Sequence, residues 1–305
     1  MRALLVVNPK ASTTSARARD VLAHALASEL KLDVAETNHR NHATELAAQA
    51  TRDGLDLVVA LGGDGTVNEV VNGLLHEGVQ AGVPALAVVP AGRTNVFARA
   101  LGLPNSAVEA TGVLLQSLLA DRRRRIGLGR ADGRWFTFNA GLGLDAGAVR
   151  RVEAARHKGR TATQGRYVKA ALQEYYFGSQ RQAHLTLTRP GAEPIELALA
   201  LVCNTDPWTY LGNRPVRPCP DATFDDGLDV LGMRAAHTVS TLRTVTQLLA
   251  KDGRPHGKRV VALHDLPELT LTAASALPFQ VDGDLVGERE VVHLESVPRA
   301  LDVVV

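Results

Sequence analysis

The chain has 305 residues, of which 45% are hydrophobic and 22% are charged, as in an ordinary globular protein. This mixture excludes a disordered or fibrous chain, and the length accommodates two domains. The 34 Lys and Arg residues against 32 Asp and Glu give a net charge of +2, too small for bulk charge to favour a nucleic-acid partner. Apolar runs reach only about seven residues, against roughly 20 for a bilayer span. We therefore expect a soluble, cytoplasmic protein.

The first 120 residues alternate between short apolar runs and amphipathic stretches. The runs that predict strands are residues 3–7, 32–36, 55–61 and 85–89. The stretches that predict helices are residues 15–30, 43–51, 66–75 and 94–101. Such alternation is typical of a parallel sheet, and strands without polar alternation are buried on both sides. We expect an α/β domain over residues 1–121, with a parallel sheet and helices on both faces.

From residue 122 to 295 the pattern predicts a second, β-rich domain. Its strand signals are residues 122–130, 134–139, 184–188, 195–203, 228–233, 260–264, 268–272, 279–281 and 290–294. Two helical stretches interrupt them, at residues 165–177 and 239–250. We expect an antiparallel, sandwich-like C-terminal domain. An apolar run at residues 300–305 predicts a strand that rejoins the first domain, which would then include residues 296–305.

The sharpest motif reads Gly-Gly-Asp-Gly-Thr-Val-Asn over residues 62–68. It follows a buried strand and opens a helix, where backbone N–H groups and the helix dipole favour an anion. Three glycines let a phosphate approach closely, and Asp64 is placed to reach a phosphate-bound Mg²⁺. Thr66 and Asn68 are suited to bind phosphate oxygens or to cap the helix. The alternative interpretation is a tight turn with Thr66 as its helix cap.

Two more polar loops follow predicted strands, at residues 8–13 and 90–95. Lys10 and Arg93 bring positive charge to them, and Thr94 brings a hydroxyl group. Ligands of open parallel sheets bind outside the carboxyl ends of the strands. We therefore expect the three loops to meet at one edge of the sheet.

These loops belong to a longer series of segments that resembles the diacylglycerol kinase catalytic family. The segments are residues 8–9, 62–69, 90–95, 100–104, 138–146, 224–230 and 281–285. They follow the family's order over nearly the whole chain. The family includes bacterial lipid kinases, eukaryotic diacylglycerol kinases and sphingosine kinases, and this chain resembles the soluble bacterial branch most.

The resemblance implies a lipid kinase that uses ATP and Mg²⁺. The nucleotide-binding residues that it implies are Asn8, Thr37, Gly62, Gly63, Asp64, Gly65, Thr66, Val67, Asn68 and Thr94. The catalytic residues that it implies are Asp282 as general base, Asp284 as a second carboxylate, and Asp64. It places a structural Mg²⁺ at the Asp226 side chain and the backbone oxygens of Thr223 and Leu228. The chain departs from the family at Asp284, where Glu is usual, and in its first loop, where Asn-Pro-Lys-Ala-Ser replaces Asn-Pro-x-Ser-Gly.

The chemistry of phosphoryl transfer agrees with these assignments. The reaction asks for positioning and charge neutralisation, and for a carboxylate that orients and deprotonates the attacking hydroxyl. Alone, however, Asp282-Gly283 and Asp225-Asp226-Gly227 are more typical of hairpin turns. Only the resemblance gives them a catalytic or metal-binding role.

The implied acceptor is diacylglycerol or a related lipid alcohol, and no nucleic-acid partner is expected. The basic residues between 150 and 169, followed by aromatic residues up to 177, predict transient docking on an anionic membrane from the cytoplasmic side. A solvated helix face is an equally good interpretation of that stretch. A homodimer is also compatible with the sequence.

Two alternative functions stay open at this stage. NAD kinases and phosphofructokinases also carry Gly-Gly-Asp-Gly and act on soluble metabolites. A non-catalytic sensor of nucleotides or lipids could keep the same fold.

Overall fold

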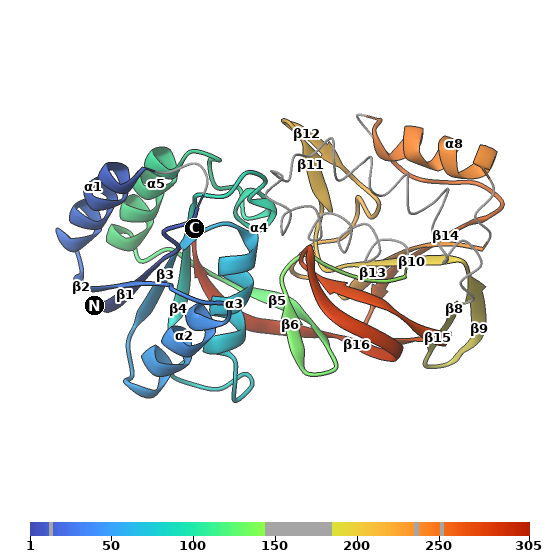
Figure 1. Cartoon of the computed structure of the whole chain (residues 1–305), viewed down its shortest axis with the longest axis horizontal. Coiled ribbons are helices and arrows are strands. Elements are labelled where there is room, and N and C mark those ends of the chain that lie inside the picture. The colour runs from blue at the N-terminus through green and yellow to red at the C-terminus, as the bar shows by residue number, and fades with distance from the viewer. Residues whose placement is uncertain (12–14, 144–184, 235–237, 251–252) are drawn as a thin grey trace. The chain divides into compact units, whose positions relative to one another are not determined.

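The computed structural model describes residues 1–11, 15–143, 185–234, 238–250 and 253–305. The chain divides into two compact units (Figure 1), of which unit 1 is Met1–Gly127 with Arg299–Val305 and unit 2 is Leu128–Pro298. The sequence had suggested divisions at 121/122 and 295/296. The structure places them inside two strands, β5 (Arg123–Ala131) and β16 (Asp284–Val304). The helix expected at 165–177 and the docking stretch at 150–169 lie outside the described residues.

Unit 1 is built on a parallel sheet. Its own strands are β1 (Arg2–Val7), β2 (Lys31–Glu36), β3 (Leu57–Gly62) and β4 (Ala85–Pro90). Its helices are α1 (Ala16–Ala27), α2 (His42–Arg52), α3 (Asp64–Leu74), α4 (Val96–Ala100) and α5 (Ala107–Leu119). The strand order is β4-β3-β1-β2, and β16 adds a further parallel strand beside β4, with Val303 opposite Leu86. The predicted α/β fold with a parallel sheet is confirmed.

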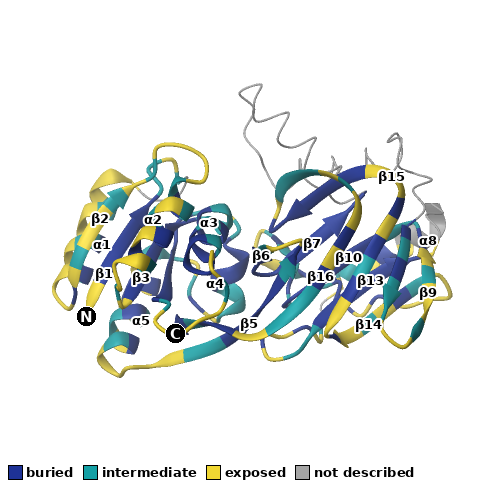
Figure 2. Ribbon diagram, turned by 90° about the horizontal axis from the view of Figure 1, so that it is seen from below, coloured by how far each residue is buried: buried dark blue, intermediate teal, exposed yellow. Residues whose placement is uncertain are grey.

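Helices cover both faces of this sheet (Figure 1). Leu26 of α1 and Leu114 of α5 pack with alternate strand residues such as Leu5 and Val59. Helices α2 and α3 pack against each other on the opposite face. Strands β1, β3 and β4 are therefore buried on both sides (Figure 2), which explains why their sequences show no polar alternation.

Helix α5 was missed in the sequence, although its start carries a recognisable signal. Ser106 precedes the helix, and its side chain accepts a hydrogen bond from the Glu109 amide at 3.5 Å. Ser followed three residues later by Glu is the capping-box pattern.

Unit 2 is β-rich and mostly antiparallel. Its strands besides the shared β5 and β16 are β6 (Arg134–Phe136), β7 (Asn139–Leu142), β8 (Leu185–Arg189), β9 (Ala192–Leu197), β10 (Leu199–Cys203), β11 (Thr209–Leu211), β12 (Arg214–Val216), β13 (Leu228–Met233), β14 (Val260–Leu266) and β15 (Glu268–Val281). One described helix, α8 (Thr238–Leu248), matches the helical stretch expected at 239–250. The main strand order is β14-β13-β10-β7-β15-β16. The predicted antiparallel, β-rich fold of this part is confirmed.

The strands of unit 2 differ from prediction in length. The runs expected at 268–272 and 279–281 form one strand, β15, because irregular pairing with β16 lets it bend and continue. The runs expected at 290–294 and 300–305 likewise belong to the single strand β16. The long run at 195–203 is instead divided between β9 and β10.

The two cysteines lie inside unit 2. Cys203 and Cys219 are both buried and unbridged, and they pack with Leu201, Ala222 and Leu231. The hydrogen bond to Cys219 and burial raise the pKa of the Cys203 thiol, which keeps it protonated.

Glycine at position 73 is required by the contact between α2 and α3. A Cβ atom there would lie 2.3 Å from the Thr44 carbonyl oxygen and 2.7 Å from the Ala47 Cβ. We predict that Gly73→Ala lowers the free energy of unfolding by about 1–3 kcal/mol, although Ala is the better helix former. Gly112→Ala on the exposed side of α5 is the matched control, because a Cβ there meets nothing within 4 Å. It should raise stability by up to about 1 kcal/mol, and urea unfolding of both variants tests the pair.

Candidate functional site

Three polar loops of unit 1 are joined by hydrogen bonds at the carboxyl ends of their strands. The Asn8 side-chain amide donates to the Thr66 hydroxyl at 3.0 Å, and the Asn8 backbone amide donates to the Leu61 carbonyl at 3.0 Å. The Ala91 amide donates to the Gly62 carbonyl at 2.8 Å. The loops after β1, β3 and β4 therefore form one continuous edge.

Two glycines of neighbouring loops lie close together at this edge. A Cβ atom on Gly92 would lie 2.7 Å from the Gly63 Cα, and one on Gly63 would lie 3.2 Å from the Gly92 Cα. Glycine at position 92 is required for this approach, because a side chain there would collide with the Gly63 Cα. The loops after β3 and β4 are therefore packed main chain against main chain at the start of α3.

Two polar side chains fix the loop after β4. Asn95 adopts a left-handed conformation, with φ of 49°, and its side chain exchanges hydrogen bonds with the Gly92 amide (2.9 Å) and carbonyl (2.8 Å). Asp64, at the start of α3, accepts a hydrogen bond from the Phe97 amide at 3.1 Å. Asp64 therefore ties the glycine-rich loop to α4, in addition to the phosphate-side role predicted for it.

The other predicted nucleotide residues divide into buried and accessible groups. Gly62, Thr66, Val67 and Asn68 are buried, whereas Asn8, Thr37, Gly63, Asp64, Gly65 and Thr94 are partly accessible. The Thr37 amide donates to the Val7 carbonyl, which joins the end of β2 to the same edge. A phosphate at this loop would therefore meet the main chain of Gly63–Gly65 rather than the Asn68 side chain.

Asp282 of unit 2 lies in the turn between β15 and β16, in a left-handed conformation with φ of 49°. It is 5% exposed, and its carboxylate accepts four hydrogen bonds. Oδ2 accepts from the Thr137 amide (2.8 Å) and hydroxyl (2.9 Å), and Oδ1 accepts from the amides of Phe138 (3.0 Å) and Asn139 (3.1 Å). Because a buried carboxylate needs such donors to stay charged, the arrangement stabilises the ionised form.

A second layer of buried amides surrounds this carboxylate. The Gln280 side chain donates to the Asn139 Oδ1 at 2.7 Å and accepts from the Gly283 amide at 2.8 Å. The Asn204 side chain donates to the Thr137 carbonyl at 3.1 Å. Sequence reasoning assigned no role to Thr137, Gln280 or Asn204. For Thr137 the reason is that 145 residues separate it from Asp282. Asp284, the first residue of β16, is partly exposed, two positions after Asp282.

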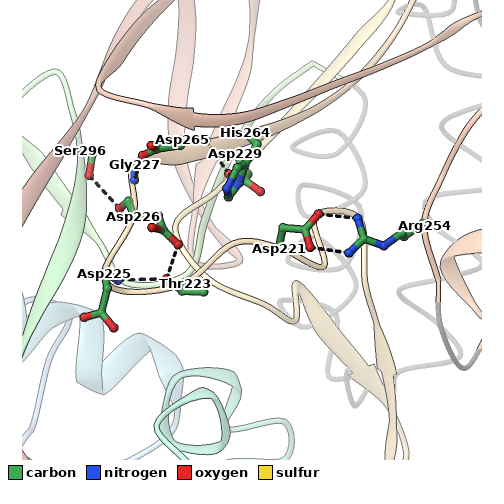
Figure 3. A network of polar contacts seen from close by, with 10 residues as sticks. All are labelled: Asp221, Thr223, Asp225, Asp226, Gly227, Asp229, Arg254, His264, Asp265 and Ser296. Carbon is green, nitrogen blue, oxygen red and sulfur yellow. Dashed lines mark hydrogen bonds and ion pairs between the residues drawn. The ribbon is translucent and has the colours of Figure 1, made fainter.

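The segment predicted to hold Mg²⁺ forms a tight loop before β13 (Figure 3). The Thr223 hydroxyl donates to the Asp226 carboxylate at 2.6 Å, and the Gly227 amide donates to the Asp265 carboxylate at 2.7 Å. Leu228 follows as the buried first residue of β13. The structure thus brings Thr223, Asp226 and Leu228 into one short loop.

The donor atoms of this loop are of the kind that Mg²⁺ prefers, a carboxylate with backbone carbonyl oxygens. Within the described ranges, no three His, Cys, Asp or Glu side chains gather as a metal site. A cation here would therefore depend on carbonyl oxygens and water besides Asp226, which suits Mg²⁺ better than a transition metal.

A buried carboxylate and a histidine lie next to this loop (Figure 3). Asp229 is 3% exposed, and its Oδ1 accepts from the Asp265 amide at 3.0 Å and pairs with the His264 Nδ1 at 2.8 Å. Burial raises the pKa of Asp229. Partial burial alone would lower the pKa of His264, but the hydrogen bond and charge of Asp229, with Asp226 and Asp221, outweigh it and raise that pKa.

Comparison with known proteins gives matches along both units. Residues 2–131 match the family described as diacylglycerol kinase catalytic domain, and residues 139–305 match the YegS C-terminal NAD kinase beta sandwich-like domain. A diacylglycerol kinase of Bacillus subtilis is 36% identical over 151 residues, 47% of this chain and 46% of that protein, so the match spans about half of each. A probable lipid kinase YegS-like of Chromohalobacter salexigens is 30% identical over 78% of this chain and 73% of that protein.

Solved structures share the fold at lower identity. A putative diacylglycerol kinase from Bacillus anthracis superposes with a TM-score of 0.78 at 21% identity, covering 99% of this chain and 96% of that one. An NAD kinase from Archaeoglobus fulgidus in complex with ATP gives 0.55 at 13% identity, covering 100% and 94%. At these identities the likeness concerns the fold alone.

An α/β unit with a glycine-rich strand-to-helix loop, followed by a β-rich unit, is the fold that this chain shares with the putative diacylglycerol kinase and the NAD kinase structures. The sequence matches decide between these branches. The chain belongs to the diacylglycerol kinase catalytic family, in the YegS-like group of lipid kinases. The family that the sequence resembled, and the kinase class that it implied, are confirmed.

The Asp229–His264 pair predicts a pH-dependent stability. Because the pKa of His264 is raised in the folded state, protonated His264 adds to the free energy of unfolding at pH values below the ordinary histidine pKa. This stabilisation is lost as the pH rises through the raised value. We expect His264→Gln to lower the urea midpoint on the acid side of this window and to leave it nearly unchanged on the alkaline side. His293→Gln, at an exposed position, is the control; equal pH dependence in the two variants would contradict the assignment.

Proposed function

We propose that this chain transfers the γ-phosphoryl group of ATP, with Mg²⁺, to the hydroxyl of diacylglycerol or a related lipid alcohol. Family membership over both units supports the reaction class. The observation that carries the nucleotide assignment is the partly accessible, glycine-rich main chain of residues 63–65, where β3 ends and helix α3 begins. Unit 1 is proposed to bind the nucleotide, and unit 2 to supply the base and bind the lipid.

The residues of unit 1 fit a triphosphate. The main chain of Gly63, Asp64 and Gly65 begins helix α3, so its N–H groups and the helix dipole favour phosphate oxygens. Asn8 and Asn95 hold the flanking loops in place, and Thr37 and Thr94 offer further donors on the same edge. When bound, Mg²⁺ with ATP would neutralise the phosphate charge, and Asp64 is the carboxylate of the loop that faces it in our proposal.

Asp282 is the proposed general base. Its four hydrogen bonds favour a fixed, ionised carboxylate, the state that a base must have before it accepts a proton. In the proposed step the lipid oxygen bonds to the γ-phosphorus while the bond from that phosphorus to the β-phosphate oxygen breaks. The hydroxyl proton passes to an oxygen of the Asp282 carboxylate as that oxygen gives up one of its two hydrogen bonds, and Asp284, two positions later in the chain, is assigned as the second acid of the motif.

A lipid acceptor brings the protein to a membrane surface. None of the helices in the described ranges has the length and apolar character of a membrane span. We propose transient, peripheral contact with the anionic inner face of the membrane, to which the basic residues between 150 and 169 would contribute roughly 1 kcal/mol for each well-placed charge.

Replacing the base tests the mechanism. Asp282→Asn should reduce kcat by about 100-fold or more, since the amide cannot accept the proton. Asp132→Asn is the matched control, because Asp132 also precedes a glycine in a hairpin turn of unit 2, with φ of 46°. Transfer of labelled phosphate from ATP to diacylglycerol in mixed micelles measures both. Equal activity of Asp282→Asn and the parent would remove Asp282 as the base.

The same assay tests the substrate class. Purified protein is given diacylglycerol, a sphingoid base, NAD or a sugar phosphate, each with Mg²⁺ and labelled ATP. Labelling of a lipid alcohol supports the proposal, and mass spectrometry of a phosphorylated lipid extract identifies the acceptor. Labelling of NAD or sugar phosphate alone would overturn the lipid assignment, and no transfer to any acceptor would favour a sensor.

Mg²⁺ binding by the loop before β13 gives a separate prediction. In the absence of nucleotide, Mg²⁺ should raise the Tm of the parent, because a ligand of the folded state stabilises it. Asp226→Ala should need about tenfold more Mg²⁺ for the same rise, or lose it. Asp225→Ala, at the exposed neighbouring position, should behave like the parent. An identical response in all three proteins would exclude a cation at this loop.

A further inference from the structure

The donors around Asp282 are not equivalent. Three are main-chain N–H groups, of Thr137, Phe138 and Asn139, which converge on the carboxylate as a backbone nest. The fourth is the Thr137 hydroxyl, the one donor of the four that a side chain supplies. A residue other than Thr or Ser at position 137 would keep the nest and lose this bond.

Thr137 cannot itself meet a substrate, because it is fully buried, with 0% exposure. Its position is fixed from outside the nest as well. Asn204 donates to its carbonyl oxygen, and Gln280 links Asn139 to the amide of Gly283, so both sides of the turn are attached to the same buried layer. A displacement of Thr137 would therefore also displace the Asp282 carboxylate that it binds.

We propose that Thr137 is a positioning residue for phosphoryl transfer, whose hydroxyl, together with the 137–139 amides, holds the Asp282 carboxylate ionised and in one orientation. This inference rests on the proposed function of Asp282. Hydrogen bonds to an ionised group are the stronger ones, and a base must be both charged and directed to act. Thr137 supplies a side-chain contribution to both requirements.

The role predicts a particular pH profile. A donor to the charged form favours that form, so removing it makes the carboxylate retain its proton to higher pH. The base is active only when ionised, and the acid limb of the kcat profile should therefore move to higher pH. The partners of Asp282 named above are uncharged, and its acidic neighbour in sequence, Asp284, is unchanged in every variant.

The decisive pair of variants is Thr137→Ser and Thr137→Ala, which both lack the methyl group and differ only in the hydroxyl oxygen. We expect Thr137→Ser to keep the parent's profile. Thr137→Ala should lose about tenfold in kcat at neutral pH, shift the acid limb upward and leave the KM for ATP unchanged. Transfer to diacylglycerol in mixed micelles is measured over the pH range in which urea unfolding shows each protein folded.

Each remaining outcome decides the question. A kcat loss without movement of the acid limb, or identical profiles for Ser and Ala, would overturn the positioning role. Thr137→Val keeps the shape of threonine and must reproduce the Ala profile; it replaces Ala if that variant does not fold. Asp282→Asn distinguishes failure of the proposed base from failure of the proposed role of Thr137. If Asp282→Asn is inactive while Thr137→Ser and Thr137→Ala have the same profile, Asp282 remains the base and the inference about Thr137 fails. Full activity of Asp282→Asn would exclude Asp282 as the base.

Discussion

Parallel pairing of strands is the interaction on which unit 1 and its candidate nucleotide site depend. It aligns the carboxyl ends of β1, β3 and β4, so that the polar loops after them must share one edge of the sheet. The hydrogen bond from Asn8 to Thr66 and the contact of Gly63 with Gly92 follow from that alignment. Helices cover both faces of this sheet, whereas the polar loops follow the ends of its strands.

Unit 2 contains a buried charge, the carboxylate of Asp282. Water that would solvate a carboxylate has to be replaced by protein donors, and removal of even one leaves a costly deficit. At Asp282 the replacement comes from a short bend between β6 and β7, which turns three consecutive amides toward one side chain. The Gln280–Asn139 bond closes the layer behind it. The geometry of a turn and the charge state of its acid are therefore set by the same residues.

The sequence allowed most of unit 1 to be predicted, because its signals are local. The spacing and glycine content of residues 62–68 are enough to predict a phosphate-binding loop, and the strands beside it are continuous apolar runs. Helix α5 was missed although the capping pattern at Ser106 was readable. Thr137 could not have been found, because its partner lies 145 residues away and nothing local marks the bond. The lengths of β15 and β16 also depend on pairing between distant segments.

Strand β16 has a consequence for the order in which the chain can fold. Leu301, Val303 and Val304 are buried in unit 1, yet they follow every residue of unit 2 in the chain. During synthesis, β4 therefore emerges from the ribosome long before its parallel neighbour. Until then its outer edge presents unpaired main-chain groups, the kind of edge on which chains aggregate. Completion of unit 1 must wait for the synthesis of unit 2.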